Sequence, residues 1–261
     1  MANKKIGFYG KLESTANNKV ENLYIIVNNK SIVFIVKHIL SNEFVSVEHF
    51  EQAADNIAWN PLFAFLQNNS SLIQNYYKHI YFVNNHSRLI LSQTDSKDNS
   101  LLAANELELI HGPKAEEEIY TSSIGDKHFL IYGVADELSA LLTRYFHSGK
   151  WQHYASFFLQ NAKENEVLIS IFEDNFLLYI VANGNSKLLN YYTLEVEDQN
   201  IYTVLNCCIN VGIDTNAFTL SVRGYEEGKH HFINKLAPYF ASKKIIQIDQ
   251  LPNAYSSYFI F

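Results

Sequence analysis

The chain has 261 residues, of which 48% are hydrophobic and 18% charged, and its formal net charge is −7. This composition supplies apolar material for one large domain or two ordinary ones, and it excludes global disorder. The longest basic groupings are the pairs Lys4–Lys5 and Lys243–Lys244, too little to neutralise the phosphates of a nucleic acid. We therefore expect no nucleic-acid partner.

The N-terminal 18 residues are polar and lead into no apolar run of signal-peptide length. The richest apolar stretch, 23–40, is interrupted at 28–31 and again at 37–38, so no segment reaches the roughly 18 apolar residues of a membrane helix. From these patterns we expect a cytoplasmic protein with no membrane partner. The aromatic stretch 255–261 is interpreted as a docking strand or an ordered terminus.

The first half begins with three strands. Short β-branched runs and alternation predict them over residues 23–29, 31–37 and 44–50, the first two joined by a tight turn. A helix is predicted next, with Asn60 as its N-cap, Pro61 at its first position and apolar spacing that continues to Tyr76. Residues 80–83 then predict a buried strand.

The middle of the chain predicts a strand over 128–133 and a helix capped by Asp136 that ends before Gly149. A more polar helical stretch follows over about 153–163. Residues 92–100 are predicted to be an exposed loop, and residues 114–118 a charged turn in which Glu116, Glu117 and Glu118 are solvated.

The second half repeats the order of the first. Its predicted strands cover residues 167–172, 176–181, 188–194, 218–222 and 245–248. One helix is expected from about Asp198, with Cys208 on its apolar face, and another from about Glu226 to Pro238. A strand hairpin, a third strand, a helix and a fourth strand therefore occur twice in the chain.

This repeated order resembles two tandem ribonuclease H-like units, which is the plan of the actin-like ATPase superfamily. The whole chain also resembles an uncharacterised bacterial family, the domain of unknown function 3822, in stretches such as 188–192 and 220–224. The resemblance implies an α/β (α+β) fold. It implies a first ribonuclease H-like half over residues 1–150 and a second over residues 151–261.

The superfamily binds phosphates with the turn of the first hairpin of each half, where Gly and Asp are typical because the backbone must approach closely. The corresponding positions here depart from that pattern. They are Asn28, Asn29 and Ser31 in the first turn, Glu173, Asp174 and Asn175 in the second, and Arg223 and Gly224 at the adenosine loop. Two carboxylates without glycine would repel a triphosphate, so these positions predict a degenerate site and no cofactor.

Other candidates for chemistry have structural explanations. A two-metal nuclease needs carboxylates on the first and fourth strands, which both predicted halves lack. Cys207 and Cys208 lie in an apolar helical pattern that favours core packing over metal or redox chemistry. His230 and His231 are adjacent on a predicted helix and therefore diverge. Tyr191, Tyr192 and the aromatic stretch 255–261 are the aromatic residues that we single out for a binding test.

The sequence thus predicts a non-catalytic interaction or scaffold protein with an unknown protein partner and a degenerate, pseudo-ATPase site. The alternative is a nucleotide (ATP)-binding protein or weak ATPase that uses the cleft between the halves. A third hypothesis is a sensor of small molecules or peptides.

Overall fold

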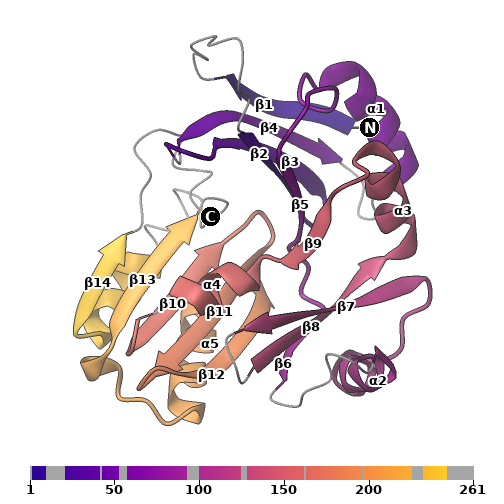
Figure 1. Ribbon diagram of the computed structural model, residues 1–261. Coiled ribbons are helices and arrows are strands. Elements are labelled where there is room, and N and C mark those ends of the chain that lie inside the picture. The colour runs from indigo at the N-terminus through magenta and orange to yellow at the C-terminus, as the bar shows by residue number, and fades with distance from the viewer. Residues whose placement is uncertain are drawn as a thin grey trace. The chain divides into compact units, whose positions relative to one another are not determined.

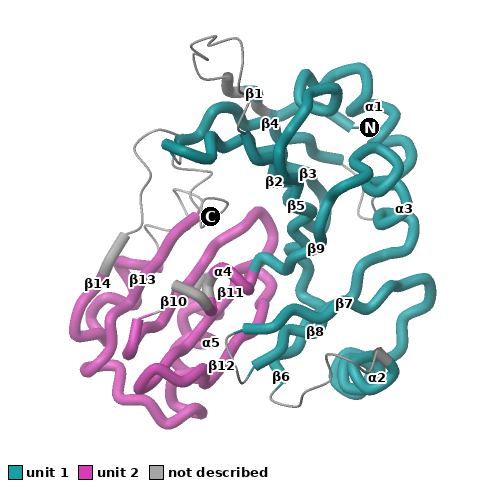
Figure 2. Tube along the Cα trace, viewed as in Figure 1, with its two compact units in different colours: residues 1–154 teal, residues 155–261 magenta. Residues whose placement is uncertain are grey.

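The computed structural model describes residues 2–9, 21–41, 43–52, 58–92, 100–124, 128–161, 163–195, 197–224 and 232–245. The chain forms two compact units, Met1–Tyr154 and Ala155–Phe261 (Figure 2). Among the described residues, no helix combines the length and the apolar character that crossing a membrane would require.

The main sheet of the first unit has six strands in the order β1-β4-β3-β2-β5-β9 (Figure 1). Their bounds are β1 Ala2–Tyr9, β2 Glu21–Val27, β3 Ser31–His38, β4 Phe44–Gln52, β5 His79–Asn84 and β9 Lys150–His153. Strands β2, β5 and β9 run parallel, while β2, β3, β4 and β1 pair antiparallel with their neighbours. The hairpin, third strand and fourth strand expected from the sequence are all present.

The sheet of the second unit has five strands in the order β12-β11-β10-β13-β14. Their bounds are β10 Glu166–Ile171, β11 Asn175–Ala182, β12 Asn185–Thr193, β13 Thr219–Gly224 and β14 Ser242–Ile245. Strands β10, β13 and β14 are parallel, and β10, β11 and β12 form an antiparallel meander. Strand β1 is an additional edge strand of the first sheet. Without it, the order β4-β3-β2-β5-β9 of the first sheet corresponds strand by strand to the order β12-β11-β10-β13-β14 of the second. The two tandem ribonuclease H-like units are therefore confirmed.

A second, three-stranded sheet lies between β5 and β9 in the sequence of the first unit. Its order is β6-β8-β7, with bounds β6 Leu89–Ser92, β7 Glu117–Ile124 and β8 His128–Ala135. Helix α2, Ser100–His111, packs on this sheet, and α3, Asp136–Tyr145, follows β8. The strand predicted over 128–133 is thus β8, the central strand of a sheet that is inserted between β5 and β9. Strand β9 returns the chain to the main sheet, beside β5.

The helix predicted from Asn60 to Tyr76 is shorter in the structure. Helix α1 spans Trp59–Asn69, and Ala58 occupies its N-cap position, so the prediction that Asn60 caps the helix is wrong. Asn60 lies in the first turn and its amide donates to Glu137 Oε1 at 2.5 Å. The helix ends because Ser70 has an extended backbone (φ −100°, ψ 129°).

Helix α3 begins at Asp136 itself, with Ala135 at the cap and no capping side chain, so the predicted cap at Asp136 is also wrong. Asp136 and Glu137 are acidic residues in the first turn, and their negative charges interact favourably with the positive end of the helix dipole. The predicted helical stretch over 153–163 is realised as α4, Ala155–Asn161, after His153 completes β9.

Strand β1 has no counterpart in the sequence-based prediction, because its exposed edge position favours lysine over apolar residues. Lys4 Nζ lies 2.6 Å from Glu48 Oε1 and Lys5 Nζ lies 3.2 Å from Glu51 Oε2, both acceptors on β4. Helix α2 and strand β7 were likewise not predicted. The polar alternation of β7 had suggested a charged turn instead of a strand.

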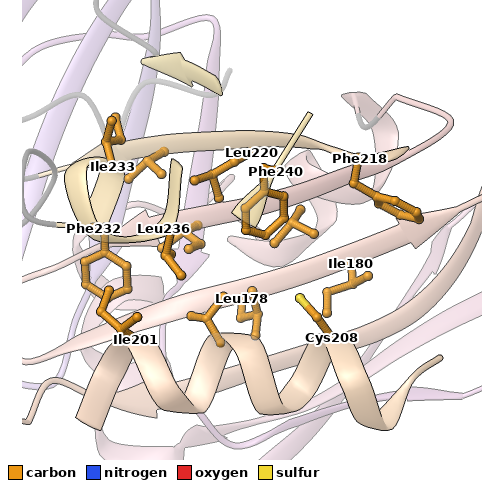
Figure 3. Packing of buried hydrophobic residues seen from close by; sticks show 14 of the residues in the cluster. Leu178, Ile180, Ile201, Cys208, Phe218, Leu220, Phe232, Ile233, Leu236 and Phe240 are labelled. Carbon is orange, nitrogen blue, oxygen red and sulfur yellow. The ribbon is translucent and has the colours of Figure 1, made fainter. Parts of the chain in front are cut away.

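A large apolar cluster lies in the second unit (Figure 3). Leu178 and Ile180 of β11 contribute to it, together with Ile201 and Cys208 of α5, Glu197–Asn210. Residues 232–236 are helical and bring Phe232 into the same cluster, where its ring centroid lies 5.2 Å from that of Phe176. Two 3-10 turns, Thr215–Ala217 and Ala237–Tyr239, flank β13 and precede β14.

Several sequence predictions lie outside the described residues. They concern His230 and His231, the start of the helix near Glu226, the loop over 93–99, the strand beyond Ile245 and the aromatic stretch 255–261.

Candidate functional site

In sheets of this kind, ligands bind outside the carboxyl ends of the parallel strands, at the point where the strand order reverses. That point lies between β2 and β5 in the first unit and between β10 and β13 in the second. The last aligned pairs there are Val27 with Asn84 and Ile171 with Gly224. The candidate residues fall into two groups at these two strand ends, one group in each unit.

The first hairpin of each unit is closed by the same backbone hydrogen bond. Asn28 N donates to Ser31 O at 2.9 Å, and Phe172 N donates to Asn175 O at 2.8 Å. Each turn therefore contains only two loop residues, Asn29–Lys30 in one unit and Glu173–Asp174 in the other. Phe172 occupies the position that corresponds to Asn28, so an aromatic ring replaces an amide at this strand end.

None of the four loop residues has a positive φ angle, since Glu116 and Asn183 are the described non-glycine residues that do. An anion-binding nest commonly gathers its N–H groups by alternating right- and left-handed residues. Neither hairpin turn has that alternation. The turns are built to reverse the chain and lack the backbone geometry that favours a phosphate cradle.

The Asn28 side chain joins the two strand ends of the first unit. Its Nδ2 donates to Ser31 Oγ at 2.9 Å, and its Oδ1 accepts from Asn85 Nδ2 at 2.7 Å. The backbone N–H of Asn85 donates to Val27 O at 2.9 Å. Asn28, Ser31 and Asn85 are all buried, so this network stabilises the contact between β2 and β5.

A second buried network lies beside it. Asn84 Nδ2 donates to Gly133 O at 2.9 Å and its Oδ1 accepts from His86 N at 3.2 Å. His153 Nε2 donates to His86 O at 3.0 Å. Burial lowers the pKa of His153 to about 3, although the bond to the His86 carbonyl acts in the opposite direction. His153 is therefore neutral at physiological pH and serves as a hydrogen-bond donor.

Sequence reasoning did not identify Asn84, Asn85, His86 or His153. A usable signal exists, because the run Asn84-Asn85-His86 directly follows the buried strand residues Phe82 and Val83. Polar side chains at that point of a parallel strand occupy the edge where ligands bind in this class of sheet. His153 has no such signal, since β9 has only four residues.

In the second unit the structure brings the predicted turn and the predicted adenosine-loop position together. Gly224 aligns with Ile171 and Arg223 with Ser170 on the neighbouring strand. Gly224 has φ +121°, a conformation that favours glycine. Glu173 and Asp174 are half-buried in the adjacent turn, and Asp174 O accepts from Leu194 N at 2.9 Å.

The remaining candidates take part in packing. Tyr191 is buried and its ring stacks on Phe172, with centroids 6.3 Å apart. Tyr192 stacks on Phe176 at 5.5 Å and its hydroxyl lies 3.1 Å from Cys207 Sγ. Cys208 is buried, as predicted for a core residue. Among the described residues, no three His, Cys, Asp or Glu side chains gather in a way that could hold a metal ion.

The acidic groups differ from the predictions in one respect. Glu117, which was expected to be solvated, has a side chain only 2% exposed, and Arg88 Nε lies 2.6 Å from its Oε2. Glu118 Oε2 accepts from Ser139 Oγ at 2.8 Å. Glu116 has φ +57°, and β7 begins at the next residue, Glu117, whose carboxyl lies beside Gly133 of β8. The prediction of a solvated side chain is therefore wrong for Glu117, whereas Glu116 and Glu118 are exposed as expected.

A buried carboxylate also lies on β10, where Glu166 accepts hydrogen bonds from the Ser221 hydroxyl and, at 3.0 Å, from Lys163 N. Glu166 begins β10 and so lies at the opposite end from the hairpin turn. Strand β13, the fourth strand of this sheet, has the sequence TLSVRG and so carries no carboxylate to face Glu166.

The family model described as a protein of unknown function, DUF3822, matches residues 11–242. The chain belongs to this family. No curated protein sequence matches it.

Two solved structures share the fold. A Bacteroides thetaiotaomicron protein with an actin-like ATPase fold and unknown function is 12% identical, with a TM-score of 0.74, and covers 87% of this chain and 91% of its own. The ethanolamine utilization protein EutJ from Carboxydothermus hydrogenoformans is 6% identical, with a TM-score of 0.53, over 93% of this chain and 89% of its own. At such identities the similarity establishes the actin-like ATPase fold and no more.

Proposed function

We propose that this protein is a non-catalytic interaction protein, in which the strand ends that bind nucleotide in actin-like ATPases serve the stability of the fold. The observation that carries the proposal is the Asn28 side chain, whose amide bonds to Ser31 and Asn85. An amide committed to two buried internal partners is unsuited to exchange them for phosphate oxygens, because each lost bond has to be replaced.

The hairpin turns support the same proposal from the backbone. Both have two loop residues without a left-handed conformation, and in the second unit those residues are Glu173 and Asp174. Two carboxylates repel phosphates unless a metal ion bridges them. We infer that the chain acts through a protein partner and uses no cofactor.

The alternative function is nucleotide binding or weak ATPase activity, and one observation favours it. Gly224 has φ +121° and aligns with Ile171, so it permits close approach to the backbone next to the Glu173–Asp174 turn. A magnesium ion held by these carboxylates would be the route by which a nucleotide could bind.

A thermal-shift titration with magnesium and ATP, ADP or GTP tests the proposal, together with calorimetry and a phosphate-release assay. A dissociation constant of about 1 mM or weaker limits the stabilisation at ~1 mM nucleotide to about 0.4 kcal/mol. For a chain of this size the melting shift is then about 1–2 °C or less. We expect that small shift and phosphate release equal to the buffer blank.

A variant with Glu173→Gln and Asp174→Asn is the matched control. A saturable shift above about 4 °C that this variant abolishes would contradict the proposal and support nucleotide binding through the second unit. A shift that is the same in the variant would contradict the proposal too, and would place the nucleotide elsewhere.

A further inference from the structure

Helix α2 has four large apolar side chains that are exposed to solvent. Leu101 is 70% exposed, Leu109 84% and Ile110 66%, and Leu102 is 39% exposed. Leu102, Asn105 and Leu109 have the spacing i, i+3, i+7 and so lie along one face of the helix. Exposed leucines that line up on one helix face mark an interaction surface more often than isolated ones do.

The opposite face of α2 is anchored to the three-stranded sheet of the insertion (Figure 1). Ala103 and Leu107 are fully buried against Ile131 of β8, with Ile90 and Ile119 packed around them. The exposed leucines are therefore not needed to hold the helix in place. They form a second apolar face on an element that already has its core contacts.

The charges beside Leu102 and Leu109 have one sign. At about 100° per residue, Glu106 and Glu108 lie on opposite sides of the line through Leu102 and Leu109. Residues 100–111 contain no lysine or arginine. The surface is thus a stripe in which Asn105 lies between Leu102 and Leu109 and a glutamate lies on either side, and this arrangement selects a partner with an apolar row and basic flanks.

The same charges disfavour two other occupants. A second copy of this chain would bring Glu106 and Glu108 close to glutamates of the same stripe, which repel one another. An anionic lipid surface would be repelled by them in the same way.

We propose that the exposed face of α2 binds an amphipathic helical segment of a partner protein, whose apolar row is flanked by lysine or arginine. This surface rests on the proposed function, since it supplies the contact through which an interaction protein would act. Leu102 and Leu109 would pack against the partner's apolar row, and Glu106 and Glu108 would pair with its basic flanks.

The probe for the test is a fluorescein-labelled synthetic helix with leucines at i, i+3, i+4 and i+7 and lysines beside them. A matched peptide has glutamates in place of the lysines. Fluorescence anisotropy with the full chain at low salt is expected to show the lysine peptide binding at least tenfold more tightly than the glutamate peptide. Raising the salt concentration should weaken binding, because exposed charge pairs are screened.

Two pairs of variants separate this surface from general attraction to an acidic protein. Leu109→Asn should weaken the lysine peptide at least tenfold, while Leu40→Asn, at a leucine that is 82% exposed elsewhere, should not. Glu106→Lys with Glu108→Lys should reverse the preference between the peptides. Glu164→Lys with Glu195→Lys makes the same change in net charge at two exposed glutamates of the other unit and should preserve it.

Equal binding of the two peptides, or Leu40→Asn and Leu109→Asn acting alike, would overturn the proposal. Sedimentation that shows a dimer abolished by Leu109→Asn would overturn it in favour of a second copy of the chain. Binding to phosphatidylserine vesicles abolished by the same variant would overturn it in favour of a membrane. None of these outcomes depends on nucleotide binding, so this surface and the proposed function can fail separately.

Discussion

Arg88 Nε lies 2.6 Å from Glu117 Oε2, and the Glu117 carboxyl fills the space where any side chain at position 133 would begin. A Cβ built on Gly133 would fall 2.0 Å from Glu117 Cδ. Position 133 therefore requires glycine, because the Glu117 carboxyl lies against its Cα. The absence of a side chain at Gly133 allows Glu117 of β7 to form a buried ion pair with Arg88, the residue before β6.

Arg88→Ala is expected to lower the free energy of unfolding on the order of 3 kcal/mol, because it leaves the Glu117 carboxylate buried. Lys114 Nζ, 3.5 Å from Glu117 Oε1, compensates in part. Urea denaturation measures the change. Lys5→Ala is the matched control, since Lys5 and Glu51 form an exposed pair worth less than about 1 kcal/mol. Equal effects of the two variants would contradict the buried-pair interpretation.

Asn28→Ala removes the side-chain bond to Ser31 of β3 and the bond from Asn85, which follows β5, and we expect a loss of about 2 kcal/mol in unfolding free energy. A double-mutant cycle with Asn85→Ala should give a coupling energy above about 0.5 kcal/mol, since the two amides are in direct contact. Asn29→Ala, at the exposed neighbouring position, should be nearly neutral. Additive effects of Asn28→Ala and Asn85→Ala would show that the network does not join the strands.

The buried His153 makes stability depend on pH. Its pKa is lowered from 6.5 to about 3 by burial, so between these values the unfolded chain binds a proton that the folded chain does not. Stability then falls as the pH falls, by about 1.4 kcal/mol per pH unit from this residue.

His153→Gln keeps a donor for the His86 carbonyl and removes the titrating group. Denaturation at several pH values between about 4 and 6.5 should give a slope that is smaller by about 1 kcal/mol per unit than in the wild type. The exposed His147→Gln controls for the loss of a histidine. An unchanged slope in His153→Gln would mean that His153 is accessible to protons in the folded state.

The two thiols should react differently. Burial raises the pKa of Cys208 to about 12 and leaves the residue 1% exposed, whereas Cys207 is partly exposed. Iodoacetamide is expected to modify Cys207 and to spare Cys208 until the protein unfolds. Cys208→Ala should cost on the order of 1 kcal/mol as a small core deletion. Peptide mass mapping at neutral pH measures the labelling, and equal labelling of both thiols would contradict the packing in the second unit.

The sequence predicted both meanders because the central strand of each is buried on both faces. Residues 31–37 and 176–181 are all buried, so they are continuous apolar runs with clear ends. Strands at an edge or in the insertion give a weaker pattern. In β1 lysines face glutamates on β4, and β7 begins with two glutamates, one buried and one hydrogen-bonded. The polar residues of such strands are stabilised by hydrogen-bond and ion-pair partners that come together only when the chain folds, so the sequence pattern alone does not identify these strands.

The same limit applies to the candidate site. The turns at Asn28 and Glu173 could be placed from the sequence because they separate two strong strands. The partners of Asn28 could not, since Asn85 lies 57 residues further along the chain. The ring of His153 packs against that of Tyr132, whose centroid lies 5.1 Å away on a strand of the insertion, and the sequence does not predict this contact.

The insertion between β5 and β9 has a consequence for the order of folding. In the first unit, residues 85–149 separate β5 from its parallel neighbour β9 in the sequence. In the second unit, only residues 225–241 separate the corresponding strands, β13 and β14. Closing a loop that is roughly fourfold longer costs about 1 kcal/mol more in chain entropy. We therefore expect β14 to join its sheet sooner than β9, so that the first unit completes folding later than the second.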